Sequence, residues 1–335
     1  MIRKSLYNQL ELAYAPITAY VFAMVREDPL IEKALEKASL YAIGQRAVIT
    51  FENIHPDQYE YQLNFEIHQK GNSEILKCKL PLIQEAVGST DKDTIAVGFN
   101  FLDKSVQQST FPLHNIHGLS LAQEIDGERK FLIWFSPEKL LQNWWTGSIR
   151  CDIEGDYQSF TNYKIHYVGK ATRQSILKRL TGHSTFQDIL SMETPVTPKQ
   201  LPANEIVILP FEFQDNIKVQ VLGDDFLGDE TKIGDLVETL RGDDQPEQEK
   251  IFLDAEKALI NAMKPSYNKE LFHNYPVSKD GLYNDKYDAI SYTFIDPITL
   301  IYNQGQIVGG PSITDSDVIQ ILDNEESRLV KRKRI

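Results

Sequence analysis

Cysteine is scarce in this chain, which has two cysteines among its 335 residues, Cys78 and Cys151. Their spacing matches no zinc-binding or disulfide pattern, which excludes the metal and disulfide scaffolds that depend on such spacing. Two isolated cysteines are typical of a protein from a reducing compartment, so we expect a cytoplasmic location.

Long hydrophobic runs are also missing. The longest, Ala13–Val25, spans 13 residues and contains Pro16 and Thr18, whereas a membrane-spanning helix needs roughly 20 apolar residues. Glu11 precedes this run and no small-residue cleavage site follows it, so the sequence predicts no signal peptide. We therefore expect no membrane partner.

The chain also lacks an excess of positive charge. The chain has 35 basic and 48 acidic residues, a net charge of −13. This excludes a generally basic, nucleic-acid-coating surface but leaves room for a local basic groove. Hydrophobic residues at 41% and charged residues at 25% describe a globular chain long enough for two or three domains.

Residues 1–145 predict an N-terminal α+β domain of unknown role. Residues 28–42 have an acidic start and apolar residues near helical spacing, so we expect a helix there. Residues 58–68 alternate between apolar and polar side chains, which predicts a half-buried strand. A short helix is expected over 136–145, with Ser136 as its N-cap and Pro137 in its first turn.

Residues 146–275 predict a second α/β segment. A strand ends at "YVGKA" (167–171), and a helix interrupted near Gly182 follows it. Residues 205–213 predict a strongly apolar strand, and residues 223–250 an acidic, exposed insertion. A helix over 251–265 ends at Pro265.

The remaining residues, 276–335, predict a small C-terminal β/α extension. It holds strands in "AISYTFID" and "ITLIYNQGQIVGG", then a helix over "DSDVIQILDNEESRLV". The chain closes on the basic tail "KRKRI", which is typical of a solvated end or a nucleic-acid contact.

The middle segment carries residue types that suit phosphate chemistry. Gly169 lets a ligand approach the backbone closely because it has no Cβ, and Lys170 follows it with a positive charge. Arg179 offers a planar fork that fits phosphate oxygens. Glu256, far along the chain, can supply a hard oxygen ligand to Mg²⁺, which proteins often hold by one or two carboxylates plus substrate phosphates.

Each of these features also has an ordinary structural explanation. A strand that ends in Gly-Lys is often only a turn, and Arg179 and His183 at i and i+4 can form a solvated helix face. A pair of histidines at His114 and His117 has no metal-ligand partners at a suitable spacing, so we interpret them as loop residues. The order and spacing of the whole set favour a functional site.

This set of motifs resembles the GIY-YIG nuclease superfamily over about 120 residues, 147–270. "YVGKA" is similar to the second half of the motif that names the family, and "KRL" at 178–180 to its arginine helix. "EKALINAMKPSYN" (256–268) is similar to the closing block, which runs from a metal-binding glutamate to an asparagine twelve residues later. "EIVILPFEF" fits the third strand of that fold.

The resemblance assigns a role to each matching position. Glu256 would bind the divalent metal, Mg²⁺ or Mn²⁺, and Arg179 would stabilise the phosphate. Tyr167 would line the site as a candidate general base, and His183 is another candidate proton acceptor. Lys170 would contact phosphate or lower the pKa of a tyrosine. The remaining assignments are Gly169 and Lys178 as nucleic-acid contacts and Asn268 as a structural anchor for the glutamate helix.

The first half of the motif departs from the family pattern. "GDY" places Tyr157 ten residues before Tyr167, with Asp156 where an apolar residue is usual. The alternative takes "SIRCDIE" (148–154) as the first strand and leaves Tyr157 in a turn. The general base therefore stays open among Tyr157, Tyr167 and His183.

Taken together, the sequence predicts an α/β (α+β) protein with a GIY-YIG-like small central sheet flanked by helices. The expected function is a divalent-metal-dependent DNA endonuclease, with a defence or restriction role suggested by analogy. Because the chain is acidic, we expect weak intrinsic DNA affinity and targeting by a protein partner or a homo-oligomer. The alternatives are a non-catalytic nucleic-acid-binding or assembly module and an RNA-cleaving toxin.

Overall fold

The structure is a computed structural model. It describes residues 2–90, 94–101, 108–125, 127–172, 174–193, 204–222, 246–285, 287–312, 315–323 and 325–332. The chain divides into two compact units, and each is built from separate stretches of sequence. The first unit comprises Met1–Gln45, Tyr163–Glu193 and Ile206–Ile335, and the second comprises Arg46–Asn162 and Thr194–Glu205. These bounds differ from the predicted ones because strands that are distant in sequence pair within the first unit.

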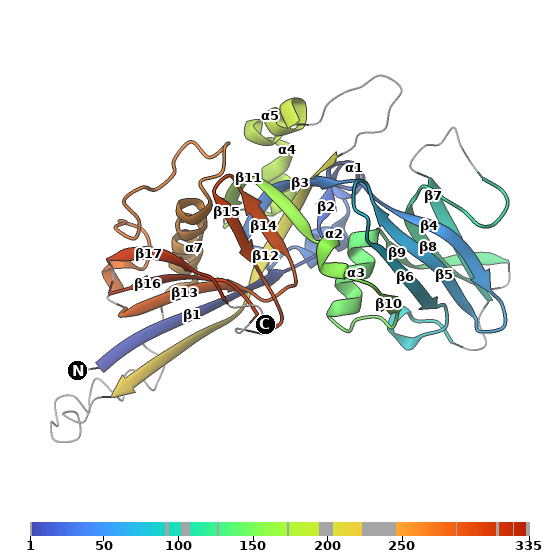
Figure 1. Cartoon of the computed structure of the whole chain (residues 1–335), viewed down its shortest axis with the longest axis horizontal. Coiled ribbons are helices and arrows are strands. Elements are labelled where there is room, and N and C mark those ends of the chain that lie inside the picture. The colour runs from blue at the N-terminus through green and yellow to red at the C-terminus, as the bar shows by residue number, and fades with distance from the viewer. Residues whose placement is uncertain are drawn as a thin grey trace. The chain divides into compact units, whose positions relative to one another are not determined.

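The first unit is built on a mixed sheet, which has ten strands within the described residues. Its order is β15-β14-β11-β3-β12-β1-β13-β16-β17, and β2 pairs with β12 (Figure 1). The strands are β1 (Ile2–Leu12), β2 (Ile17–Thr18), β3 (Leu40–Ala47), β11 (Asn162–Lys170), β12 (Asn204–Leu222), β13 (Ala289–Phe294), β14 (Thr299–Tyr302), β15 (Gly305–Val308), β16 (Val318–Leu322) and β17 (Glu326–Val330).

Five described helices belong to this unit. They are α1 (Ala19–Val25), α2 (Pro29–Ala34), α4 (Ile176–Thr181), α5 (Ser184–Glu193) and α7 (Gln248–Met263). Helix α7 packs against β16 and β17 (Figure 1), with Ala255, Ala258 and Leu259 buried. It ends where Lys264 takes a left-handed backbone conformation immediately before Pro265, close to the predicted end.

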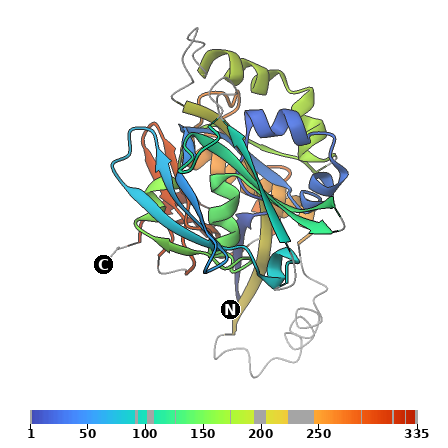
Figure 2. The ribbon, with the colours of Figure 1, turned by 90° about the vertical axis from the view of Figure 1, so that its right-hand side faces the viewer.

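The second unit is an antiparallel sheet covered by a helix. Its seven described strands are β4 (Ile49–Asp57), β5 (Gln62–Gln69), β6 (Ile75–Pro81), β7 (Thr94–Phe101), β8 (Ile116–Ile125), β9 (Glu128–Phe135) and β10 (Asp152–Glu154). Helix α3 (Pro137–Trp145) lies against β4 and β9 (Figure 2). Ser136 caps α3 by accepting a hydrogen bond from the backbone N–H of Lys139 at 3.2 Å, as the sequence predicts.

The alternating pattern of residues 58–68 holds only in its second half. Leu63, Phe65 and Ile67 on β5 are buried in the core of the second unit, while Tyr59 and Tyr61 precede the strand and are exposed. Cys78 and Cys151 are free thiols in the same core. Hydrogen bonding to Cys151 and burial raise the pKa of the Cys78 thiol.

One predicted helix is too long, and another is wrong. The helix expected over 28–42 ends at Ala34, and β3 begins at Leu40. Residues 40–43 are buried on both faces of a central strand, so their continuous apolar run does not distinguish a strand from a buried helix. The helix expected near the C-terminus is the hairpin β16-β17, in which Val318 pairs with Val330.

The predicted acidic insertion falls largely outside the part of the chain that the structure describes. Residues 223–245 lie there, and Gln248–Lys250 form the first turn of α7. Residues 333–335 of the basic tail also lie outside the description, whereas Lys331 pairs with Asp317 at 2.8 Å. No helix among the described residues is long and apolar enough to cross a membrane.

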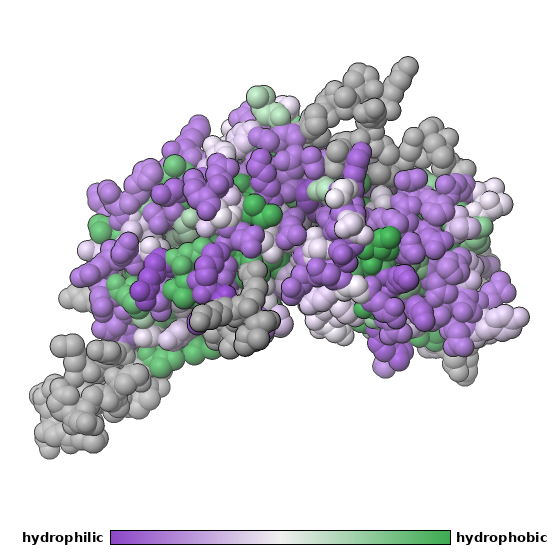
Figure 3. All heavy atoms as spheres, viewed as in Figure 1, coloured by the Kyte–Doolittle hydropathy of each residue, from purple (hydrophilic) through white to green (hydrophobic). Residues whose placement is uncertain are grey.

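On the face drawn in Figure 3, the described surface is largely hydrophilic, and hydrophobic residues form only small separate patches. This matches a chain in which a quarter of the residues are charged.

Candidate active site

The site is built around two neighbouring strands, β11 and β3, which pair antiparallel in the first unit. This pairing replaces both predicted partners of the "YVGKA" strand. The segment "SIRCDIE" contributes β10, which pairs with β6 in the second unit, and Tyr157 opens a short 3₁₀ helix in that unit. The strand beside Tyr167 therefore comes from residues 40–47, a segment that the sequence prediction had placed partly in a helix.

Two tyrosines lie together on this strand pair. Tyr41 on β3 is opposite Gly169 on β11, and the ring centroids of Tyr41 and Tyr167 are 6.0 Å apart. Tyr41 is fully buried, whereas Tyr167 is half-buried. Burial raises the pKa of the Tyr41 hydroxyl, and the neighbouring Tyr167 adds to this effect. Tyr41 therefore stays protonated at neutral pH.

Gly169 leaves room for these rings and not for a ligand. A Cβ at this position would lie 2.7 Å from Cε1 of Tyr167 and 2.8 Å from the hydroxyl of Tyr41. The expected role of Gly169 as a nucleic-acid contact is therefore wrong, because this buried backbone is covered by the two tyrosines. The glycine is needed for packing within the site.

Helix α4 brings Arg179 to the tyrosines. Ser175 caps this helix by accepting a hydrogen bond from the backbone N–H of Lys178 at 3.4 Å. Nε of Arg179 donates to the hydroxyl of Tyr41 at 3.1 Å. This bond uses one donor of the guanidinium and leaves the others for an anion.

His183 packs edge to face on Tyr167, with ring centroids 5.2 Å apart. Its Nδ1 accepts a hydrogen bond from the backbone N–H of Phe186 at 3.3 Å, which caps the start of α5. Burial, with a smaller contribution from Arg179, lowers the pKa of His183, so the ring is neutral near pH 7. A neutral ring that accepts at Nδ1 carries its proton on Nε2. This tautomer has no free acceptor nitrogen for a water proton.

Glu256 and Lys170 meet from two different elements. The carboxylate of Glu256, on α7, lies 2.9 Å from the ammonium of Lys170, at the end of β11. The Glu256 side chain is 13% exposed and that of Lys170 27% exposed, so the pair is partly shielded from water. The ion pair joins the two ends of the motif set, "YVGKA" and the glutamate block, at one place in the fold.

A hollow of about 690 Å³ lies beside this ion pair, and we call it the Lys170 hollow. Glu249 and Leu253 of α7 line it at i and i+4, and Glu256 follows on the same helix at i+7. Among the residues that the structure describes, the lining consists of Lys170, Ala171, Thr172, Gln174, Arg179, Glu249, Leu253 and Asp280. A ligand in this hollow would contact the two cations that the sequence singled out.

Two other predicted residues have structural partners. Asn268 accepts from the backbone N–H of Val168 at 2.9 Å and donates to its carbonyl at 2.8 Å, which ties the turn after α7 to β11. Lys178 pairs with Glu32 of α2 at 2.8 Å, and the structure does not place it in the lining of the Lys170 hollow.

Tyr157 does not join this group. It packs edge to face on Trp144, with ring centroids 5.0 Å apart, against the hydrophobic core of the second unit. The expectation that Tyr157 is catalytic through the "GDY" motif is therefore wrong on its placement. His114 in the same unit accepts from the backbone N–H of Asn53 and lies 3.2 Å from Glu52.

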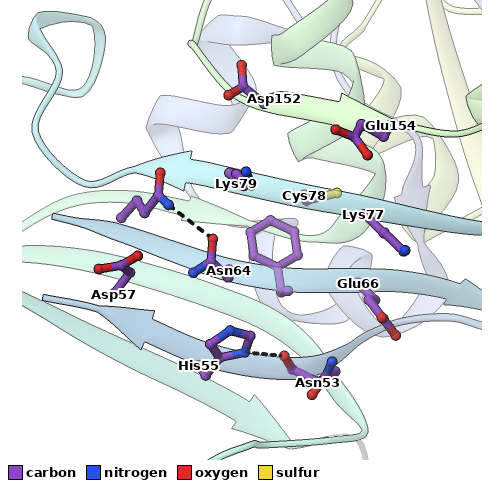
Figure 4. A pocket seen from close by; sticks show the side chains of 12 residues that line it. Asn53, His55, Asp57, Asn64, Glu66, Lys77, Cys78, Lys79, Asp152 and Glu154 are labelled. Carbon is purple, nitrogen blue, oxygen red and sulfur yellow. Dashed lines mark hydrogen bonds between the residues drawn. The ribbon is translucent and has the colours of Figure 1, made fainter. Parts of the chain in front are cut away.

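The second unit has its own hollow of about 470 Å³ on the outer face of its sheet (Figure 4). Opposite charges face each other across the strands there: Glu66 pairs with Lys77, and Lys77 with Glu154. Lys79 is likewise opposite Asp152. Oppositely charged neighbours across paired strands are the usual content of a solvated sheet face.

The structure also shows site residues that the sequence did not reveal. Tyr41 is one, and Asp254 on α7 is another. Asp254 is buried, and its Oδ2 accepts from the hydroxyls of Tyr275 at 2.6 Å and Tyr292 at 2.7 Å. Its Oδ1 accepts from the backbone N–H of Leu282 at 3.0 Å, and burial raises its pKa. Asp254 thus fixes the loop that carries Asp280 to the Lys170 hollow.

Comparisons of the chain with protein families, with curated proteins and with solved structures found no match. Among the residues that the structure describes, no group of three or more His, Cys, Asp or Glu side chains is placed to hold a metal ion.

Proposed function

We propose that the first unit is a divalent-metal-dependent nuclease that hydrolyses phosphodiester bonds in DNA. The observation that carries the proposal is the meeting of Arg179, Tyr41 and Tyr167 with the Lys170–Glu256 pair beside one hollow. A folded core does not require two cations, two adjacent phenols and a carboxylate from four separate elements at one place. Phosphoryl chemistry uses each of them.

The first half of the GIY-YIG motif is then "SLY" at 39–41, in place of either predicted register. The three strands that the resemblance requires are β3, β11 and β12, and they lie side by side in the order β11-β3-β12. The inserted second unit separates the two half-motifs along the chain, because it lies between β3 and β11. This arrangement supports the family resemblance, although the spacing is not the usual one.

The donor chemistry at Glu256 fits a divalent cation. A carboxylate is the hard oxygen ligand that Mg²⁺ and Mn²⁺ accept. The Glu256 carboxylate already has a positive charge beside it, the ammonium of Lys170, so this position favours a cation. Glu256 would hold the ion, and substrate phosphate and water would complete its coordination. When bound, the ion would polarise a phosphoryl oxygen and offset developing negative charge.

The residues of the chain itself supply the other steps. Arg179 keeps one donor on Tyr41 and directs its remaining donors to the phosphate, where negative charge grows in the transition state. The phenolate form of Tyr167 would take the proton from water, because Nδ1 of His183 is occupied and Tyr41 is fully buried and held protonated. His183 supports the Tyr167 ring from its edge.

DNA is the proposed substrate, and a targeting partner or a homo-oligomer is part of the proposal. With a net charge of −13, the chain supplies little of the phosphate neutralisation that non-specific DNA binding requires. The second unit, which contributes no residue to the site as described, is the candidate for that targeting. A role in defence or restriction rests on analogy alone.

One observation favours a second candidate, a non-catalytic nucleic-acid-binding module. Glu256 already has a cationic partner in Lys170, and such a pair can serve packing alone.

A cleavage assay separates the two candidates. Purified protein is incubated with supercoiled plasmid, linear duplex DNA and RNA in Mg²⁺, Mn²⁺ or EDTA. We expect metal-dependent cleavage of DNA, and a loss of roughly 10²-fold or more in Glu256→Gln, the size expected when a catalytic electrostatic group is removed. Asp285→Asn is the matched control, since Asp285 also pairs with a lysine, Lys250, at 3.3 Å. Cleavage by Glu256→Gln at the wild-type rate would refute the nuclease proposal.

A further inference from the structure

The position of the Lys170–Glu256 ion pair affects how readily a divalent cation would bind at Glu256. The ammonium of Lys170 lies 2.9 Å from the carboxylate that the proposed function assigns to the divalent cation. A carboxylate with one negative charge is thereby neutralised within the protein. A divalent cation that approached Glu256 would meet a positive charge next to it, and the two cations would repel each other.

The lysine cannot leave this place without cost. Its side chain is only 27% exposed, and a partly buried ammonium that loses its partner keeps much of its desolvation penalty. Asp280 is the nearest alternative that the structure suggests, since the charge of Lys170 contributes to the lowered pKa of Asp280. The larger part of that lowering comes from a hydrogen bond with Lys257, so Asp280 already has a cation of its own.

A phosphate group would offer Lys170 a new partner. Lys170 lines the hollow together with Arg179, so an anion bound there lies within reach of both cations. With its ammonium drawn to the phosphate, Lys170 would release the Glu256 carboxylate.

We infer that Lys170 is an internal counter-cation that keeps Glu256 closed to divalent cations until a phosphate group enters the hollow. Metal binding and phosphate binding at this site are then positively coupled, and each raises the affinity for the other by the same factor. The free protein would bind Mg²⁺ or Mn²⁺ weakly, and bound nucleic acid would raise the affinity of the site for the metal ion. This inference rests on the proposed function, because it takes Glu256 as the metal ligand.

Direct measurement of Mn²⁺ binding tests the coupling without any cleavage. Free Mn²⁺ is followed by electron paramagnetic resonance during titration of the full chain, with and without sulfate, a phosphate-shaped anion that leaves Mn²⁺ in solution. We expect sulfate to tighten Mn²⁺ binding to the wild type by roughly tenfold, within the usual range of coupling between two sites. In Lys170→Met we expect Mn²⁺ to bind tightly without sulfate and sulfate to have little further effect.

Two variants serve as controls. Lys250→Met breaks another lysine–carboxylate pair on α7, with Asp285 at 3.3 Å, and should behave like the wild type. Glu256→Gln should lose Mn²⁺ binding. If Lys170→Met does not fold, Lys170→Gln and the sulfate response of the wild type carry the test.

The outcomes separate the inference from the proposed function. The coupling is overturned if Lys170→Met has the Mn²⁺ affinity of the wild type and sulfate does not change the Mn²⁺ affinity of the wild type. This holds even if Glu256→Gln abolishes Mn²⁺ binding. Equal Mn²⁺ binding in Glu256→Gln and the wild type would show that Glu256 is not the metal ligand. That result overturns both the coupling and the metal assignment of the proposed function.

Discussion

An alanine at position 169 would place a methyl group between the two tyrosine rings of the site. The added Cβ would lie 2.7 Å from Cε1 of Tyr167 and 2.9 Å from Cζ of Tyr41. Ordinary contacts between carbon atoms are about 3.5–4.0 Å, so the rings would have to withdraw by at least about 0.6–0.8 Å. The strand pairing of β11 with β3 limits how far the backbone can follow.

The expected magnitude follows from this overlap. Inserting a methyl group into a well-packed region costs about 1–3 kcal/mol of folding free energy. The displaced Tyr41 would also move its hydroxyl away from Arg179, whose Nε donates to it at 3.1 Å. A misplacement of about 1 Å within a site can cost about 10²-fold in rate, so we expect cleavage to fall by roughly 10–100-fold.

Stability is measured by urea unfolding monitored by circular dichroism, and activity by the rate of plasmid cleavage at saturating Mg²⁺. Gly182→Ala is the matched control, because a Cβ there meets no atom within 4 Å and its φ is −104°. We expect the control to stay within about 1 kcal/mol of the wild type. A Gly169→Ala protein with both wild-type stability and wild-type cleavage would contradict the tyrosine packing described here.

Two further predictions concern Arg179 and Asp254. Arg179→Lys keeps the charge but loses the planar guanidinium that donates to Tyr41, so we expect the single-turnover cleavage rate to fall by roughly 10²-fold. A rate within twofold of the wild type would show that Arg179 does not take part in catalysis. Asp254→Ala leaves two buried hydroxyls and one backbone N–H without their acceptor, each at about 1–3 kcal/mol. Because the burial cost of the carboxylate is relieved at the same time, we expect a net loss of about 3 kcal/mol in the free energy of unfolding from urea denaturation, and a loss below about 1 kcal/mol would contradict the network.

The sequence was informative where local chemistry decides the structure. Ser136 and Pro137 predicted the start of α3, and Pro265 the end of α7. The strand over 205–213 belongs to β12, and its apolar run is largely buried, as its composition predicts: Ile206, Val207, Ile208, Leu209 and Phe211. Residues of the two strongest motifs, Lys170 and Glu256, meet in the structure although they are far apart in the chain.

The sequence failed where distant pairing decides the structure. No local pattern marks Tyr41 as the partner of Gly169, since the strand pair is formed across the inserted second unit. Tyr157 met the expected spacing within the motif and yet packs on Trp144. The C-terminal hairpin also carried a usable signal: Val318, Ile319 and Ile321 are β-branched and buried, which favours a strand over the predicted helix.

The insertion of the second unit between β3 and β11 has a consequence for synthesis of the chain. Translation proceeds at about 5–20 residues per second, so the roughly 120 residues between the two strands take about 6–24 s to emerge. During that time β3, with its apolar residues 40–43, has left the ribosome without the strand that will lie beside Gly169. The Arg46–Asn162 part of the second unit, which holds the seven described strands of its sheet, can fold in this interval. The residues that we propose to contact phosphate are therefore among the last to assemble, because the proposed site is incomplete until α7 has been made.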